Sequence, residues 1–325
     1  DQGLFSVPCG QGVERLVLVC VEGGPNTPRS RVSLFSGRRI MAQMSAGSSA
    51  SGRLPHFERP PVIETVLGVQ FDPLPKLGSA HLGAFWKRLG SEWPNVTDAP
   101  PITPRFERFD DAGTWGEVGF PLKFTRDLSV RIQIRNAAGN RMIQVQNGRL
   151  HYNWLGGDGG EYPRYREVRP GFDRIWEEFQ RFLAEEALGE TRLNQWEVTY
   201  VNQIPKGLLW NSPADWAKLF RSPVTLSVGA APVMLESFGG EWHYEIRPQR
   251  GRLHVLIQHG RLSGPASREV LRLTLTARGP IRGDGNDGLS LDDGLNLGRA
   301  VIVRTFKDLT SDKAHACWGL VHEHD

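Results

Sequence analysis

From residue 60 onwards the sequence repeats one order of elements: a strand, a helix, several strands and a second helix. In the first half, Val62–Phe71 has the apolar pattern of a strand, and Gly171–Leu188 carries apolar residues at helical spacing. In the second half, Trp196–Ile204 is the first strand, and the chain ends in a helix. Runs of strands with few helices between them form antiparallel sheets. We therefore predict an α+β fold of two similar halves, each an antiparallel sheet with helices.

Short sequence similarities between residues 60–190 and residues 191–325 support an internal duplication with pseudo-twofold symmetry. QNGRL (146–150) matches QHGRL (258–262), and FDPLPK (71–76) resembles VNQIPK (201–206). A groove between two such halves is the expected ligand site. Further strands are expected at Trp115–Phe124, Ser129–Arg135, Arg141–Trp154 with a turn at Asn147-Gly148, Glu241–Arg247, Arg252–Gln258 and Glu269–Ala277, and helices after Ser79 and Ser212.

Composition separates residues 1–59 from the rest of the chain. This segment holds seven arginines and four acids, which account for the whole formal charge of +3, whereas all ten tryptophans lie at Trp86 or later. Ser45–Gly52 is rich in serine, glycine and alanine, as flexible segments are. We expect residues 1–59 to be a leader outside the fold. It is either a disordered native arm or a non-native extension upstream of a start at Met41.

The remaining residues limit the compartment and the partners. Cys317 is the only cysteine after residue 59, which favours a reducing, cytoplasmic location. No apolar run approaches the roughly 18 residues of a membrane span, so we expect no membrane partner. Residues 60–325 are formally neutral. Nucleic acid is therefore not the favoured partner, although Arg131, Arg135, Arg141 and Arg149 lie on expected strands.

Two metal- or phosphate-like motifs do not fit their usual context. Gly283–Gly288 matches GxGxxG, but Asp284 and Asp287 would repel a phosphate and no parallel βαβ unit surrounds it. The tail carries His315, Cys317, His322, Glu323 and His324, but chain ends usually fray. We predict no cofactor, no metal site and no catalytic residue.

Five segments resemble a sporadically distributed prokaryotic family of conserved hypothetical proteins with no assigned biochemical function. They are PPVIETVLGVQFDPLP (60–75), MIQVQNGRLHYNW (142–154), EYPRYREVRPGFDRIWEEF (161–179), WEVTYVNQI (196–204) and FKDLTSDKAHACWG (306–319). The resemblance covers about residues 58–320. It implies a stand-alone bacterial cytoplasmic protein, encoded in a mobile or defence-associated locus, and it implies no catalytic residues.

Aromatic residues and arginines gather around the glycine-rich turn at 156–160. Binding surfaces use this combination, so Trp154, Tyr162, Arg164 and Tyr165, together with Tyr200 and Asn202, are candidate binding residues. The alternative is that these rings cap the core where a strand leads into a helix. Our first hypothesis is a non-enzymatic binding or interaction protein. Its partner is expected to be another protein, encoded by a neighbouring gene.

The second hypothesis is an enzyme or nucleotide-handling protein. Glu64 and Glu197 each lie in the first strand of a half, where an acid either faces solvent or lines a cleft. With an arginine in the cleft between the halves, they would form the candidate site of such a protein.

Overall fold

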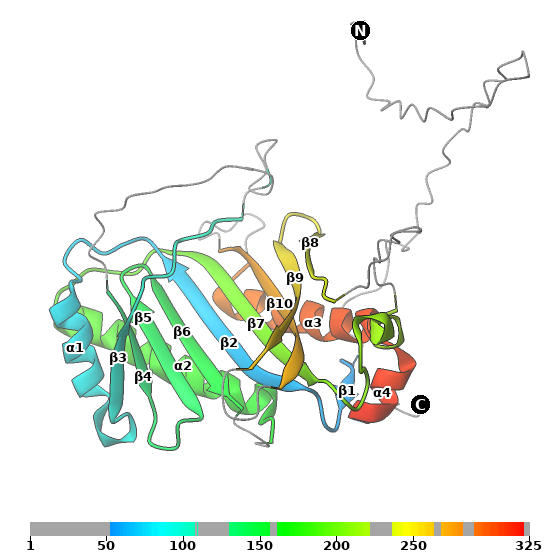
Figure 1. Ribbon diagram of the computed structural model, residues 1–325. Helices are drawn as coiled ribbons and strands as arrows, with labels where there is room; N and C mark the ends of the chain where they lie inside the picture. Colours follow the sequence, from blue (N-terminus) through cyan, green and yellow to red (C-terminus); the bar gives the residue numbers. More distant parts are fainter. Residues whose placement is uncertain are drawn as a thin grey trace, which may run out of the picture. The chain divides into compact units, whose positions relative to one another are not determined.

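A single antiparallel sheet of nine strands organises the computed structural model, which describes residues 53–107, 109, 130–156, 161–221, 236–262, 268–281 and 289–321 (Figure 1). The strands lie in the order β3 (Asn95–Ala99), β4 (Arg131–Arg135), β5 (Arg141–Gln146), β6 (Arg149–Leu155), β2 (Val62–Phe71), β7 (Leu193–Pro205), β10 (Glu269–Pro280), β9 (Gly251–Arg261) and β8 (Gly240–Ile246). Every pair of neighbouring strands is antiparallel. The α+β class predicted from the sequence is confirmed.

Two long helices cover one face of this sheet. Helix α2 (Arg164–Glu185) packs on β6, and α3 (Leu291–Leu309) packs on β7 and β10. The shorter elements are α1 (Ser79–Arg88), α4 (Asp312–Trp318) and two 3-10 turns at Gly90–Glu92 and Pro213–Lys218. Among the described residues, no helix has the length and apolar character needed to cross a bilayer.

Alternation along the strands separates the two faces of the sheet. In β6, Leu150, Tyr152 and Trp154 are buried on the helix side, and Arg149, His151 and Asn153 point to the opposite side. The helices contribute the other half of the core through apolar stripes at helical spacing. In α2 this stripe is Phe172, Ile175, Trp176, Phe179, Phe182 and Leu183, all buried.

Helix α3 approaches the sheet closely because glycines face Trp196. A Cβ atom on Gly294 would lie 2.3 Å from Trp196 Cδ1, and one on Gly298 would lie 2.8 Å from Trp196 Cζ3. Trp196 itself is fully buried. The glycines therefore act by leaving room for the indole, and a larger residue at either position requires the helix to move.

The first strands of the two halves, β2 and β7, are neighbours at the centre of the sheet. They pair along most of their length, with Leu67 opposite Val198 and Gly68 opposite Glu197. The halves thus share one continuous sheet instead of forming two separate sheets. On either side of this central pair, the later strands follow in the reverse of their chain order, β6-β5-β4-β3 and β10-β9-β8.

The folded chain begins before residue 60. Strand β1 (His56–Phe57) pairs with β11 (Leu320–Val321), and the buried Phe57 ring contacts Phe306 and Trp318. Residues 53–59 therefore belong to the fold, and the predicted leader boundary at residue 59 lies too far along the chain. Residues 1–52 lie outside the described part of the chain.

Several local predictions can be compared with the structure. The Asn147-Gly148 turn is confirmed, and Gly148 has the positive φ of +94° that favours glycine there. Helix α2 begins at Arg164, not at Gly171, so the segment expected to be a connecting loop is its first turn. Ser79 is the first residue of α1, and the cap is Gly78. The strand expected at Trp115–Phe124 and the Gly283–Gly288 motif fall outside the described residues.

Candidate functional site

A small pocket opens between the N-terminal end of α2 and the middle of α3. Its polar lining comes from Tyr162, Arg164, Tyr165, Tyr200 and Arg299, and we call it the Tyr–Arg pocket. The remaining lining residues are Pro55, His56, Phe57, Pro60, Val62, Asn202, Ile302, Val303 and Phe306. The pocket therefore joins segments of both halves on the helix side of the sheet.

Five of the six aromatic, arginine and asparagine residues proposed from the sequence line this pocket. They are Tyr162, Arg164, Tyr165, Tyr200 and Asn202. Trp154 lies behind them, 3% exposed, with its ring centroid 5.3 Å from that of Tyr162. A flat aromatic surface is excluded because Trp154, Tyr165 and Tyr200 are buried. The rings therefore form and support the walls of a concave site.

Arg164 holds the segment around β1 over the pocket. Its guanidinium group donates hydrogen bonds to the backbone oxygens of Phe57 (2.8 Å) and Glu58 (3.1 Å). The residue has a φ of +54°, which is strained for any side chain other than glycine. These two hydrogen bonds offset that strain, and they explain how an irregular helix start is maintained beside the pocket.

The tyrosines of the pocket are neutral hydrogen-bonding groups. The hydroxyls of Tyr162 and Tyr200 are hydrogen-bonded to each other at 3.1 Å. Burial raises the pKa of Tyr162, and burial together with the neighbouring Tyr162 raises the pKa of Tyr200 well above its usual range. Both hydroxyls therefore stay protonated at neutral pH, and neither is suited to be a general base. Tyr162 donates its hydrogen to Tyr200, so the Tyr200 hydroxyl is the one whose hydrogen is available to a ligand.

Positive charge in the pocket is not balanced by a carboxylate. Arg299 stacks over the ring of Tyr165 at 4.7 Å and forms no ion pair with the described residues. The second guanidinium group, that of Arg164, donates to backbone oxygens. Among the described residues that line the pocket there is no aspartate or glutamate. The arrangement therefore favours a group with negative charge.

The opposite side of the sheet, away from α2 and α3, carries a second cluster of polar residues, which we call the polar face. One row runs directly across eight strands, from β4 to β8: Gln133, Gln144, His151, Gly68, Glu197, Arg278, Arg252 and Glu245. Several of these side chains are buried, including His151, Arg252 and Arg278. Buried polar groups of this kind are stable only when they are paired.

Glu107 is the centre of the pairing on the polar face. Its carboxylate accepts hydrogen bonds from Arg252 Nη1 (2.6 Å), Arg278 Nε (2.6 Å) and His254 Nε2 (2.7 Å). Burial opposes ionisation of this carboxyl group, but the hydrogen bonds from His254 and Arg278 and the positive charge of Arg278 lower its pKa to about 2. Glu107 is therefore ionised throughout the physiological range.

His151 and Glu197 extend this network over the centre of the sheet. The His151 ring lies directly above Gly68, where a Cβ atom would be 2.6 Å from the ring, and its Nε2 is 3.7 Å from Glu197 Oε1. Burial lowers the pKa of His151 to about 4 despite the nearby glutamate. Glu197 Oε2 lies 3.8 Å from Arg278 Nη1. Glu197 is thus a half-buried residue that lies between His151 and Arg278.

Glu64, the other proposed acid, lies elsewhere on the polar face. It accepts a hydrogen bond from Asn153 Nδ2 at 2.6 Å. Glu64 and Gly68, the residue opposite Glu197, are four positions apart on β2, or roughly 13 Å at the rise of a strand. The two glutamates therefore do not form a carboxylate pair.

Glutamine side chains bind the segment that carries Glu107 across the sheet. Gln146 accepts from the Ile102 N–H (2.8 Å) and donates to the Ile102 oxygen (2.9 Å). Gln195 accepts from the Glu107 N–H (3.0 Å) and donates to the backbone oxygen of Arg105 (2.6 Å). These contacts explain why residues 100–107 stay extended over the sheet without joining it as a strand.

Sequence reasoning identified Glu64 and Glu197, which lie on the polar face, but missed Glu107, the centre of its pairing. Glu107 has no signal, because it lies between predicted elements. A weaker signal existed in the strands, whose second face carries arginine, histidine, glutamine and asparagine. A sheet face that is open to solvent usually carries more lysine and glutamate. The composition of this face is therefore typical of a polar surface that another part of the chain covers.

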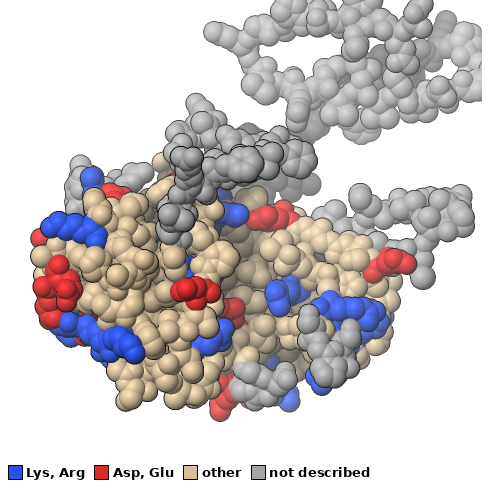
Figure 2. Space-filling model, turned by 60° about the vertical axis from the view of Figure 1, so that its left-hand side comes forward, with Lys and Arg blue, Asp and Glu red and all other residues tan. Residues whose placement is uncertain are grey.

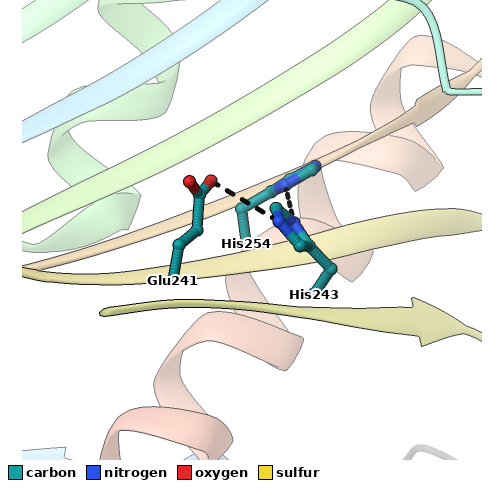
Figure 3. Close-up of side chains that lie close together, drawn as sticks. All are labelled: Glu241, His243 and His254. Carbon is teal, nitrogen blue, oxygen red and sulfur yellow. Dashed lines mark hydrogen bonds and ion pairs between the residues drawn. The ribbon is translucent and has the colours of Figure 1, made fainter. Parts of the chain in front are cut away.

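At the outer edge of the polar face, Glu241, His243 and His254 offer three possible metal ligands (Figure 3).

Charged groups elsewhere on the surface are dispersed. On the side drawn in Figure 2, lysines and arginines are interspersed with aspartates and glutamates. Ion pairs of this kind include those of Arg88 with Glu178 and Glu185. That side has no continuous basic surface of the kind that phosphate backbones require.

Comparison with models of known protein families gives no match, and comparisons with curated proteins and with solved structures give none either. The function must therefore be argued from the geometry of the residues themselves.

Proposed function

We propose that this chain is a non-enzymatic binding protein that takes an acidic group of a partner protein into the Tyr–Arg pocket. The observation that carries the proposal is the charge of the lining: Arg164 and Arg299 face a pocket without a carboxylate. Tyrosine and arginine are also the residues that most often dominate the energy of protein interfaces.

The size of the pocket selects the kind of ligand. Its volume is about 80 Å³, whereas sites for drug-sized ligands and cofactors measure roughly 300–1,000 Å³. The pocket is large enough for one side chain or a chain end, but too small for a nucleotide. The apolar wall of Val62, Ile302, Val303 and Phe306 would contact the aliphatic part of that group. A glutamate side chain or a C-terminal carboxylate fits these conditions.

The alternative, an enzyme or nucleotide-handling protein, draws support from the titratable groups of the polar face. Glu107, His151 and Glu197 have shifted pKa values, which active sites often show. However, hydrogen bonds and ion pairs within the chain already engage Glu107 and Glu197. A stabilising role for this network is the simpler explanation, and we place the binding function first.

We also infer that the two halves arose by duplication. Support comes from the position of the similar segments: QNGRL forms the turn between β5 and β6, and QHGRL ends β9 before the connection to β10. FDPLPK and VNQIPK both lie at the ends of the central strands β2 and β7. In this interpretation α2 and α3 are equivalent helices, and the Tyr–Arg pocket lies where they meet.

The proposed family membership is compatible with this site. The segments that carry the resemblance form β2, β5 with β6, the first part of α2, β7, and the end of α3 with α4. Four of the five segments contribute residues to the pocket. A bacterial, cytoplasmic protein whose partner is encoded by a neighbouring gene remains part of the proposal. The single cysteine after residue 59 supports the reducing compartment.

A peptide array tests the binding function. The full chain is applied to short peptides in matched pairs that differ only by Glu or Gln, Asp or Asn, or a free or amidated C-terminus. The carboxylate member should bind at least about tenfold tighter, equivalent to about 1.4 kcal/mol. Arg299→Ala should remove this preference, and Arg174→Ala, on the exposed side of α2, should keep it. Equal binding of the acid and amide members would count against the proposal.

A further inference from the structure

The outer edge of the polar face contains a histidine pair that the pairing of the sheet does not require. His243 on β8 and His254 on β9 are opposite each other, and their Nδ1 atoms are 2.6 Å apart. Glu241, two residues before His243 on the same face of β8, has Oε1 3.8 Å from His243 Nε2 (Figure 3). One ligand atom from each of the three residues lies within 4.8 Å of the others.

The second ring nitrogen of His254 is already fixed. Its Nε2 lies 2.7 Å from Glu107 Oε1 and 3.0 Å from Arg278 Nη2, and the shorter contact, with the ionised carboxylate, assigns this nitrogen as a donor. In the neutral ring the proton is then on Nε2, and the lone pair of Nδ1 points towards His243. A carboxylate that orients a histidine in this way is a regular feature of metal-binding histidines.

We propose that Glu241, His243 and His254 bind a divalent transition-metal ion of the zinc type. The two Nδ1 atoms and one carboxylate oxygen supply three ligands, and a solvent molecule completes a tetrahedral shell. Glu107 is a positioning residue for His254 and does not touch the ion.

The geometry requires only a small adjustment. Two nitrogens on a tetrahedral Zn²⁺ are about 3.3 Å apart, given bond lengths of roughly 2.0–2.1 Å. The imidazole rings must therefore separate by less than 1 Å from their 2.6 Å contact. His243 is on the edge strand of the sheet with a 28% exposed side chain, so its ring has room to turn and the ion has a path from solvent.

The charges near the site also favour a cation over an anion. Glu241 is half exposed beside the histidines, and Glu107 lies directly behind His254. Arg252 and Arg278 pair with Glu107 at nitrogen–oxygen distances of 2.6 Å, and Arg278 Nη2 also lies 3.0 Å from His254 Nε2. These contacts are on the Nε2 side of His254, and its Nδ1 is the nitrogen that faces His243. No sequence spacing motif indicates this site, because its ligands come from two strands joined by a turn.

Zinc titration of the purified full chain tests the proposal. After treatment with a chelator and dialysis, Zn²⁺ is added in competition with a chromophoric chelator. The chain should bind one equivalent, and His243→Ala should weaken binding at least about 100-fold. Glu107→Gln should weaken it about 10–100-fold, as loss of an outer-shell carboxylate does. His81→Ala, which changes a half-buried histidine in α1 outside the polar face, should bind as the wild type does.

Cobalt provides a second readout that does not depend on the stability of a variant. Co²⁺ bound by the wild-type chain should show the intense visible absorption of a tetrahedral site, and His243→Ala should lack it. Zinc binding by His243→Ala with the wild-type affinity, or wild-type binding no tighter than that of the His243→Ala, His254→Ala double variant, would overturn the proposal.

Discussion

The two faces of the central sheet are both largely buried, yet different chemistry covers them. On one face, α2 and α3 press apolar side chains onto Leu150, Trp196 and Leu273. On the other, an extended segment ending in Glu107 is bound by glutamine, arginine and histidine side chains. The helix face is stabilised by shape and apolar area, and the polar face by charge pairing. The two faces should therefore respond differently to mutation and to pH.

The largest effect is expected on the helix face. Trp196→Ala removes a fully buried indole that contacts Gly294 and Gly298. Loss of apolar contacts and the resulting cavity should lower the free energy of unfolding by about 3–5 kcal/mol. Denaturant unfolding monitored by circular dichroism measures this, and the loss should be the same at pH 5 and pH 8. A loss below 1 kcal/mol would show that the helix face is not tightly packed.

On the polar face, removing a charge should matter almost as much as removing a ring. Glu107→Gln leaves Arg252, Arg278 and His254 without their shared carboxylate. Breaking a buried ion pair from one side costs about 3 kcal/mol or more. The matched control is Glu190→Gln at an exposed position, which should change stability by less than about 0.5 kcal/mol. Equal stability of the two variants would show that the network is dispensable.

His151 should make the polar face sensitive to pH. Burial lowers its pKa from 6.5 to about 4, so the unfolded chain takes up a proton at higher pH than the folded chain does. The stabilising effect of the neutral ring is complete above pH 6.5 and is lost as the pH falls towards 4, up to about 3 kcal/mol. Unfolding between pH 7 and 4 should show this decrease, and His151→Gln should reduce its slope. An unchanged slope in the variant would assign the decrease to other groups.

The smallest change in stability is expected from replacing single helix glycines with alanine. Two such variants separate a steric clash from the general effect of alanine on helix stability. Gly294→Ala places a Cβ 2.3 Å from Trp196 and should destabilise by about 1–3 kcal/mol. Gly83→Ala in α1 meets no atom within 4 Å and should be neutral or stabilising by up to about 1 kcal/mol. Thermal unfolding of both variants compares them directly. Destabilisation by both would point to a general effect on helices.

The sequence predicts the helix face better than the polar face, and the reason is physical. Periodicity identifies β2, whose bounds Val62–Phe71 match the prediction, because an apolar face repeats along the chain. The gathering of aromatic residues and arginines around the turn at 156–160 led to Tyr162 and Arg164, which meet Tyr200 at the pocket. Glu107 and Arg299 could not be found in this way. Their partners are distant in sequence, and such contacts depend on the register of the strands and on a segment without regular structure.

The binding function has the most direct test in the Tyr–Arg pocket itself. Isothermal titration calorimetry compares the tightest acidic peptide from the array on the wild-type chain and on Arg299→Ala, with unfolding temperatures recorded for both. Because Arg299 forms no ion pair with the described residues, the two unfolding temperatures should agree, and the Kd of the variant should be at least about tenfold higher. Equal Kd values for the two proteins would contradict the proposed function.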